Sequence, residues 1–181
     1  MGMKVSYKSK GDDFPNMIKR LEALNGTAVE VGVLKGEHKW LAAIHEYGLD
    51  IEVTPAMRAY LHGQGLHLKD STTHIHIPER SFLRTGYDKN RDDVMKKAKR
   101  LLQEVAAGRM SARGCMQALG IELSSKIKDY AVELDSPPNH PFTVDRKGSS
   151  NPLVGGGEGS GGESGPGGGD MIGGITWRKA K

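Results

Sequence analysis

The chain has 181 residues, of which 36% are hydrophobic and 25 are glycine, and its formal net charge is +4. This length suits one domain with appendages rather than two full domains. The single cysteine, Cys115, excludes an intrachain disulfide. No apolar run reaches the roughly 18 residues that a membrane span needs, and the N-terminal residues lack the apolar core of a signal peptide. We therefore expect synthesis and folding in the cytoplasm, with no membrane partner.

The first half of the sequence predicts short helices and strands. In chain order we expect a strand at 3–8, a helix from Asp12 or Asp13 to Leu24, a strand at 27–34, a helix at 39–47, a strand at 51–54, a helix at 55–62 and a strand at 74–77. The clearest strand contains Val29, Val31 and Val33, which alternate with small or charged residues as in a half-buried strand. Gly48 is the residue type that closes a helix.

Two longer helices are predicted next. From about Asp88, apolar residues at helical spacing form one stripe, which ends at Gly108. Ser111 is a good capping residue for a second helix, whose apolar stripe continues to Leu134. Two consecutive prolines at 137 and 138 end that helix, because proline cannot continue the hydrogen-bond pattern.

The C-terminal part differs in composition from the rest. Residues 155–169 contain ten glycines in fifteen positions, and such a segment cannot bury enough surface to offset the entropy lost on ordering. We interpret it as a flexible linker, followed by a strand at 171–178. The predicted organisation is therefore a core domain at 1–136, an irregular arm at 137–170 that includes the linker at 155–169, and a C-terminal strand segment at 171–181. The predicted fold class is α+β, a small and mostly antiparallel sheet packed by two long helices, with a flexible Gly-rich C-terminal insertion.

Seven histidines raise the question of a metal site, but their spacing does not support one. His74 and His76 share one face of a predicted strand, and His62 and His67 lie just upstream. The sequence has no HExxH motif, no cysteine pair and no carboxylate at a convincing ligand spacing. We interpret these histidines as surface residues and predict neither a metal nor a cofactor.

Other groups with catalytic potential have a simpler structural interpretation. His45 and Glu46 are adjacent on a predicted helix and point about 100° apart, so they do not converge on one reacting atom. We expect that one of them helps to close the helix end. The glycine block lacks the GK[ST] ending of a phosphate-binding loop, and Cys115 has no catalytic neighbours in the sequence. We predict that the chain is not an enzyme.

Arginine and aromatic residues occur together in the segment PERSFLR. Arg80 and Arg84 flank Phe82 and Leu83 there. An arginine beside an aromatic ring can anchor a protein interface. The same segment can equally begin a helix whose Phe and Leu enter the core, so the residues alone leave both interpretations open.

Several short segments form an ordered set, and they are residues 29–34 (VEVGVL), 42–48 (AAIHEYG), 77–84 (IPERSFLR), 137–141 (PPNHP), 146–148 (RKG), 151–154 (NPLV) and 171–177 (MIGGITW). In this order they resemble the tail-completion, or head–tail joining, family of tailed bacteriophages, which includes proteins similar to minor tail protein Z. The chain departs from that family at the glycine block, which stands in place of a short turn. Residues 63–73 are also longer than the family pattern.

The resemblance implies a non-enzymatic structural protein of the virion, located at the neck or tail top. It implies a homo-oligomeric ring, commonly sixfold, that completes the tail and joins it to the head connector. Its partners would be the connector or portal adaptor and the tail terminator or tube proteins, and genomic DNA would pass through the lumen without sequence-specific binding. On this basis we expect subunit or partner contacts from Arg80, Phe82 and Arg84, and from Phe142 and Trp177 in the C-terminal extension.

Three alternatives remain from the sequence. The first is a tail terminator or another neck ring protein, because these folds overlap. The second is a small nucleic-acid-binding protein, which the basic stretch at 96–100 supports weakly, since its cations alternate with an apolar stripe as on a solvated helix face. The third is a metalloenzyme that uses the histidines.

Overall fold

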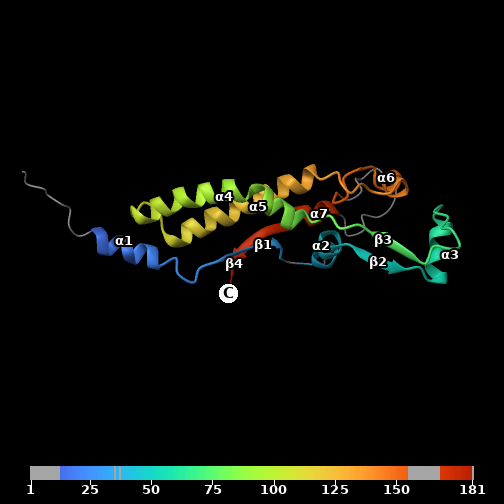
Figure 1. The fold of residues 1–181 in the computed structure, drawn as a ribbon, viewed down its shortest axis with the longest axis horizontal. Helices are drawn as coiled ribbons and strands as arrows, with labels where there is room; N and C mark the ends of the chain where they lie inside the picture. The colour runs from blue at the N-terminus through green and yellow to red at the C-terminus, as the bar shows by residue number, and fades with distance from the viewer. Residues whose placement is uncertain (1–12, 35, 37, 155–167, 181) are drawn as a thin grey trace, which may run out of the picture.

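The computed structural model describes residues 13–34, 36, 38–154 and 168–180. The expected strand at 3–8 and most of the glycine linker lie outside these residues. The described part has seven helices and two small antiparallel sheets, so the α+β prediction is confirmed (Figure 1). None of its helices combines the length and the apolar character that crossing a membrane requires.

The elements in chain order are α1 (Asp13–Glu22), β1 (Val29–Val33), α2 (His38–Tyr47), β2 (Leu49–Glu52), α3 (Pro55–Gly63), β3 (His74–Ile77), α4 (Phe82–Ala106), α5 (Ala112–Glu133), α6 (Pro141–Lys147), α7 (Gly168–Gly173) and β4 (Ile175–Lys179). As far as α5 they follow the predicted order, whereas α6 and α7 were not predicted and the expected C-terminal strand is shorter, since Met171 to Gly173 belong to α7. The helix expected from Asp88 begins six positions earlier, at Phe82. Ser111 caps α5 as predicted, because its Oγ accepts a hydrogen bond from the backbone N–H of Gly114 at 3.0 Å.

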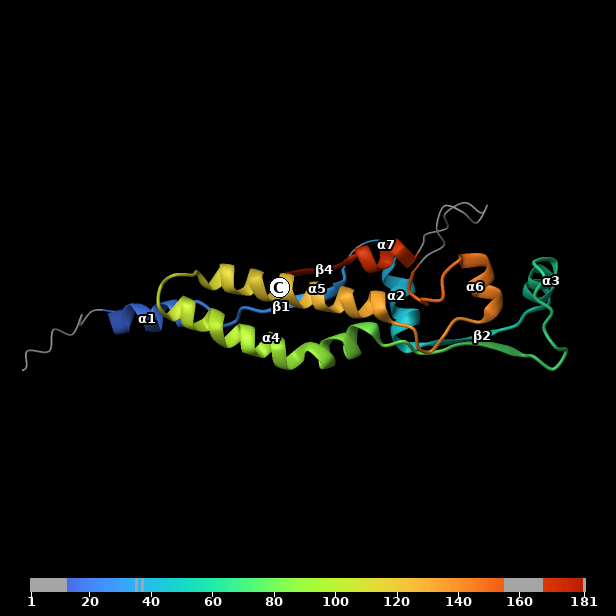
Figure 2. The same ribbon diagram turned by 90° about the horizontal axis from the view of Figure 1, so that it is seen from above.

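The body of the molecule is a long hairpin of α4 and α5 with the β1–β4 sheet lying along α5 (Figures 1 and 2). The sheet pairs Val31 with Trp177 and Val33 with Ile175 on its helix-facing side. Its other side carries an ion pair between Glu30 and Arg178, with Arg178 Nη2 2.6 Å from Glu30 Oε2. One face is therefore packed and the other is polar, as the alternation in β1 predicts.

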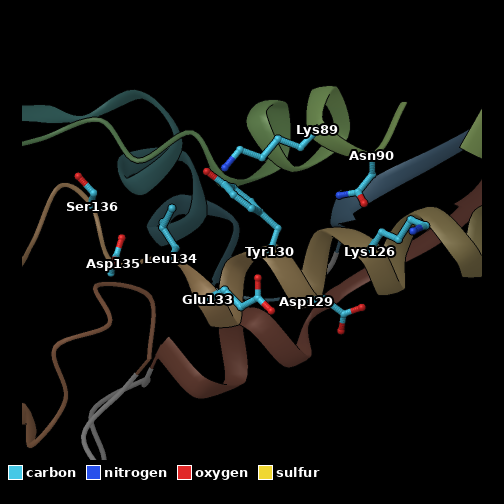
Figure 3. A pocket seen from close by; sticks show the side chains of 9 residues that line it. All are labelled: Lys89, Asn90, Lys126, Asp129, Tyr130, Glu133, Leu134, Asp135 and Ser136. Carbon is cyan, nitrogen blue, oxygen red and sulfur yellow. The ribbon is translucent and has the colours of Figure 1, made fainter. Parts of the chain in front are cut away.

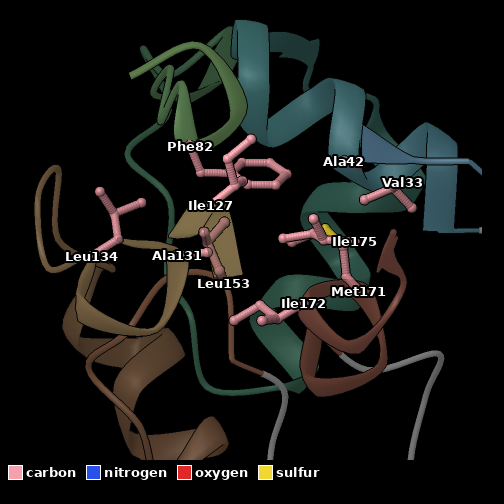
Figure 4. Packing of buried hydrophobic residues seen from close by; sticks show 10 residues of the cluster. All are labelled: Val33, Ala42, Phe82, Ile127, Ala131, Leu134, Leu153, Met171, Ile172 and Ile175. Atoms are coloured by element: carbon pink, nitrogen blue, oxygen red, sulfur yellow. The ribbon is translucent and has the colours of Figure 1, made fainter. Parts of the chain in front are cut away.

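The hydrophobic core lies where the hairpin, α2 and the C-terminal segment meet (Figure 4). Phe82, Leu153, Met171 and Ile175 are fully buried there. Two corrections follow for the predicted irregular arm at 137–170. It contains the helix α6, and Leu153 from its end packs into the core, because a large apolar side chain is stabilised by removal from water.

The remaining two strands form a separate ribbon, β2 and β3, which projects from the end of the body and carries α3 at its far end (Figures 1 and 2). We call β2 and β3 together the ribbon. The predicted single small sheet is therefore two sheets of two strands. Alternation identified the strands but could not give their partners, because β1 pairs with β4, which follows it by more than 140 residues.

Gly120 provides a direct test of how the sheet packs on α5. A Cβ atom at this position would lie 2.6 Å from Trp177 Cδ2, which is closer than side chains tolerate. We expect Gly120→Ala to lower the free energy of unfolding by about 1–3 kcal/mol, because the indole has to move out of its packed position. Urea denaturation would measure this loss.

Gly63→Ala is the matched control, since a Cβ at Gly63 meets no atom within 4 Å. It should leave stability nearly unchanged. Trp177→Leu combined with Gly120→Ala should recover part of the loss. Equal stability of the Gly120→Ala protein and the wild type would show that Trp177 does not pack on α5.

Candidate functional site

Three segments that are far apart in the sequence meet at the base of the ribbon. They are residues 45–48 at the end of α2, residues 78–84 at the start of α4, and residues 137–139 after α5. We call this arrangement the junction. The ribbon begins and ends at it, since β2 starts one residue after Gly48 and β3 ends one residue before Pro78. The junction therefore sets the direction in which the ribbon leaves the body.

Glu46 is the central side chain of the junction and is only 3% exposed. Its Oε2 accepts a hydrogen bond from the backbone N–H of Leu83 at 2.9 Å, and its Oε1 accepts one from the N–H of Arg84 at 3.1 Å. These N–H groups belong to the first turn of α4, where no intrahelical acceptor exists. The carboxylate of one helix thus caps the next helix, and its negative charge suits the positive end of the α4 dipole.

Arg84 completes the interaction with Glu46. Its Nε donates to Glu46 Oε1 at 2.8 Å, and its Nη2 donates to the Glu46 carbonyl oxygen and to Glu79 Oε1, each at 2.7 Å. Hydrogen bonding to Glu46 is the main reason why the pKa of Arg84 is raised. The guanidinium also lies over the ring of Tyr47, 4.8 Å from its centre. The Arg84 side chain remains about half exposed beside these contacts.

Arg80 connects the junction to the segment that follows α5. Its Nε donates to the carbonyl oxygen of Pro137 at 2.8 Å, and its Nη2 donates to that of Pro138 at 3.1 Å. Its own backbone N–H donates to the carbonyl oxygen of His45 at 2.7 Å. Arg80 is only 5% exposed, and this burial lowers its pKa. The cation therefore binds backbone carbonyls of its own chain.

His45 lies among positive charges. Burial lowers its pKa to about 4, with further contributions from Arg80 and Lys147. Its Nδ1 is buried and has no hydrogen-bond partner. The imidazole is therefore neutral near pH 7, with the positive charges of Arg80 and Lys147 opposing its protonation.

Gly48 allows the close approach of the two motif segments. Its φ is +73°, and a Cβ there would lie 2.9 Å from both Glu79 N and the Ile77 carbonyl oxygen. Any other residue would combine a strained backbone with a steric clash. The predicted role of Gly48 as a helix-closing residue is confirmed, and the structure adds the contact with Glu79 as a second reason for glycine.

The segment after the junction is fastened to α5 by Asn151. Its Nδ2 donates to the carbonyl oxygens of Ala131 at 3.2 Å and Val132 at 2.6 Å, which belong to the last turn of α5. Lys147 Nζ donates to the carbonyls of Asn151 and Pro152 at 3.0 and 3.1 Å. These bonds place Leu153 in the core. The segments 146–148 and 151–154 thus have intrachain roles.

The five predicted contact residues do not form one exposed surface in the structure. Phe82 is fully buried in the core and Arg80 is buried in the junction, so neither side chain is available to a partner in this conformation. Arg84 is partly exposed but bound by Glu46. Phe142 is half-buried beneath the guanidinium of Arg146, and Trp177 packs on α5. The junction gathers Arg80, Phe82 and Arg84, whereas the other two lie elsewhere.

The histidines form no complete metal site. Among the described residues, no group of three or more His, Cys, Asp or Glu side chains is placed to hold a metal ion. His62 and His67 approach each other with their Nδ1 atoms 2.8 Å apart, and His76 Nδ1 lies 2.7 Å from Asp50 Oδ1. The buried Cys115 has a raised pKa because of its burial, and a thiol with a raised pKa is a poor nucleophile.

A polar cleft of about 460 Å³ lies between α4 and the end of α5 (Figure 3). Lys89 Nζ lies 4.6 Å above the centre of the Tyr130 ring on its wall. The lining mixes both signs of charge, since Lys89 and Lys126 occur with Asp129, Glu133 and Asp135. Such a lining has no single charge preference, so it favours no particular ionic ligand.

Comparisons of the chain with protein-family models, with curated proteins and with solved structures gave no significant match.

Sequence reasoning identified the junction segments but not the way in which they interact. The interpretation of His45 and Glu46 assigned one of them to their own helix end, whereas Glu46 caps the helix that begins 36 residues later. No local spacing signals such a cap. Asn151 was likewise missed, because its acceptors lie about 20 residues upstream. The one available signal was the presence of a Glu in the last turn of a helix, where the dipole disfavours a negative charge.

Removing the Glu46 carboxylate should destabilise the protein strongly. We expect Glu46→Ala to lower the free energy of unfolding by about 2–4 kcal/mol, because two buried backbone N–H groups at the start of α4 lose their acceptor. Glu46→Gln should have an intermediate effect, since its amide oxygen can still accept one bond. Glu79→Ala is the control, since it removes only an exposed partner of Arg84. An equal loss in Glu46→Ala and Glu79→Ala would contradict the capping role.

The low pKa of His45 gives the folded protein a pH-dependent stability. Below pH 6.5 the unfolded chain binds a proton at His45 that the folded chain does not bind until about pH 4. Stability should therefore fall as the pH decreases through this window, by up to about 1.4 kcal/mol per pH unit. Urea denaturation of wild type and His45→Gln between about pH 6.5 and 5 would show a smaller slope for the variant. Parallel slopes in the two proteins would assign the pH dependence to other groups.

Proposed function

We propose that this chain is a structural subunit of a tailed bacteriophage, which forms a ring at the tail top or neck and joins the tail to the DNA-filled head. The observation that carries the proposal is the convergence of the resembling segments. AAIHEYG, IPERSFLR and PPNHP, which are separate in the sequence, meet at the junction through Glu46, Arg84 and Arg80. The segments that carry the resemblance therefore contact one another in the structure, although they are far apart in the sequence.

The shape of the subunit supports the same proposal. A ring subunit needs two different surfaces, one for the neighbour on each side. Here the hairpin of α4 and α5 forms the body, and the ribbon with α3 extends beyond it (Figure 1). An element that projects from the body can reach an adjacent subunit, and the junction holds its base in one orientation.

The basic stretch at 96–100 gives less support to the alternative of nucleic-acid binding. Lys97 pairs with Glu122 of α5, and Lys96 pairs with Asp93. Lys97 thus links the two helices of the hairpin, whereas the Lys96 pair lies within α4. The neighbouring carboxylates partly neutralise the charges of both lysines. The exposed Lys99 and Arg100 remain on the outer part of α4.

Deleting the gene from a phage that encodes this chain would test the proposal. Electron microscopy of the lysate should show filled heads beside separate tails of normal length, because the joint is missing. Supplying the wild-type gene from a plasmid should restore joined particles and serves as the control. Tails of irregular length would instead support the tail-terminator alternative, and normally joined particles from the deletion phage would contradict the proposal.

A further inference from the structure

The β1–β4 sheet and α5 separate toward the N-terminal end of α5. Ile175, Trp177 and Lys179 lie on the helix-facing side of β4, because alternate residues of a strand share a side. Ile175 is fully buried, Trp177 is half-buried and Lys179 is exposed. On α5, Gly120 is buried against Trp177, whereas Arg113, seven positions earlier, is exposed. The packing between sheet and helix therefore ends before the two elements do.

A groove of about 900 Å³ lies where this packing ends. The first turns of α5 line it with Ala112 and Met116, the sheet lines it with Val29 and Trp177, and the loop between α1 and β1 contributes Ala23. Apolar side chains supply most of its surface. A volume of about 300–1,000 Å³ and a mainly apolar lining with a few polar groups are typical of binding sites.

The charges at the groove have one sign. Of the twelve described residues that line it, the charged ones are Arg113, Arg178 and Lys179. Arg178 is paired with Glu30 at 2.6 Å on the other side of the sheet. Arg113 and Lys179 are exposed and have no ion-pair partner in the described part of the chain. A negatively charged group beside an apolar one therefore complements this lining.

The segments of this chain outside the described residues do not have that chemistry. Residues 1–12 carry three lysines and a single carboxylate, so the cations of the groove would repel them. Residues 155–167 carry Glu158 and Glu163 but, apart from one proline, no apolar side chain. They would leave the apolar walls uncovered. The occupant that suits the groove therefore comes from another molecule.

We propose that this groove binds a peptide segment of a partner protein in which apolar side chains lie next to carboxylates. The apolar side chains would pack against Trp177 and Met116, and the carboxylates would pair with Arg113 and Lys179. An apolar centre surrounded by a polar rim is the usual arrangement of a protein interface. Tryptophan and arginine, which both occur here, are also the residue types that most often dominate binding energy.

Trp177 has two contacts in this arrangement. One part of its indole packs on Gly120, and another part lines the groove. The expectation that Trp177 contacts a partner thus returns in a different form, separate from Arg80, Phe82 and Arg84 at the junction. The inference goes beyond the proposed function, since it assigns a binding surface without requiring a ring or a position in the virion.

The fluorescence of Trp177 provides a local test. The chain has two tryptophans, and Trp40 is 70% exposed on α2. Trp40→Phe would therefore leave Trp177 as the single reporter in an otherwise complete chain. We would select binders from a random peptide library on this protein, and synthesise the strongest one with phenylalanine in place of any tryptophan. Titration of that peptide would follow the emission of Trp177.

The selected peptides should carry Asp or Glu beside aliphatic or aromatic residues. Binding should shift the emission of Trp177 to shorter wavelengths, because the peptide removes water from the indole. Arg113→Glu with Lys179→Glu should weaken binding by about tenfold or more, since both rim cations are reversed. Lys99→Glu with Arg100→Glu is the matched control, because it changes the net charge equally on an exposed part of α4. It should leave the affinity nearly unchanged.

A variant that narrows the groove without changing its charge keeps the test independent of the charge reversals. Ala112→Leu adds apolar volume to the wall and should also weaken binding, and circular dichroism would verify that each variant is folded. Four results would overturn the inference. They are the absence of enriched peptides, enriched peptides without carboxylates, binding that leaves the emission of Trp177 unchanged, and equal affinity of the groove and control charge variants. A shift that depends on protein concentration without peptide would instead assign the groove to a second copy of the chain, and would refute a partner of different sequence.

Discussion

The structure depends most on the carboxylate of Glu46. A nearly buried negative charge is unfavourable unless donors surround it, and here two backbone N–H groups and the Arg84 guanidinium do so. The same bonds begin α4 six residues earlier than its apolar stripe alone predicts. Because α4 then forms the hairpin with α5, the placement of one side chain determines where the body of the molecule begins and how it is oriented to α2.

Arg80 and Asn151 extend this arrangement to the C-terminal third of the chain. Both use side-chain donors to satisfy backbone carbonyl oxygens, Arg80 at Pro137 and Pro138 and Asn151 at the last turn of α5. Carbonyls at a helix end and in a proline-containing segment have no regular partners, and buried acceptors without partners are destabilising. These polar contacts direct the chain back so that Leu153 enters the core beside Met171 and Ile175.

The sequence predicted local elements well and long-range relations poorly, for a physical reason. Alternation of Val29, Val31 and Val33 and the cap at Ser111 are encoded within a few residues, and both are confirmed. The pairing of β1 with β4 depends on tertiary contacts across the whole chain, as does the cap that Glu46 gives to α4. The glycine-rich composition gave no sign that the residues on both sides of it, Leu153 and Met171 among them, pack into one core.

Several exposed apolar residues lie on elements that are distant from the core. The core is concentrated near the junction, so elements distant from it have less to pack against. α1 exposes Phe14 and Ile18 at one end of the molecule, and α3 exposes Tyr60 at the other (Figure 2). Polar side chains would suffice at both ends if water were their permanent surroundings. Apolar side chains there instead lie on elements that are held in place, since Arg20 ties α1 to the end of α4 and Arg58 ties α3 to the loop before β3, and exposed apolar side chains on ordered elements are typical of surfaces that bind a partner.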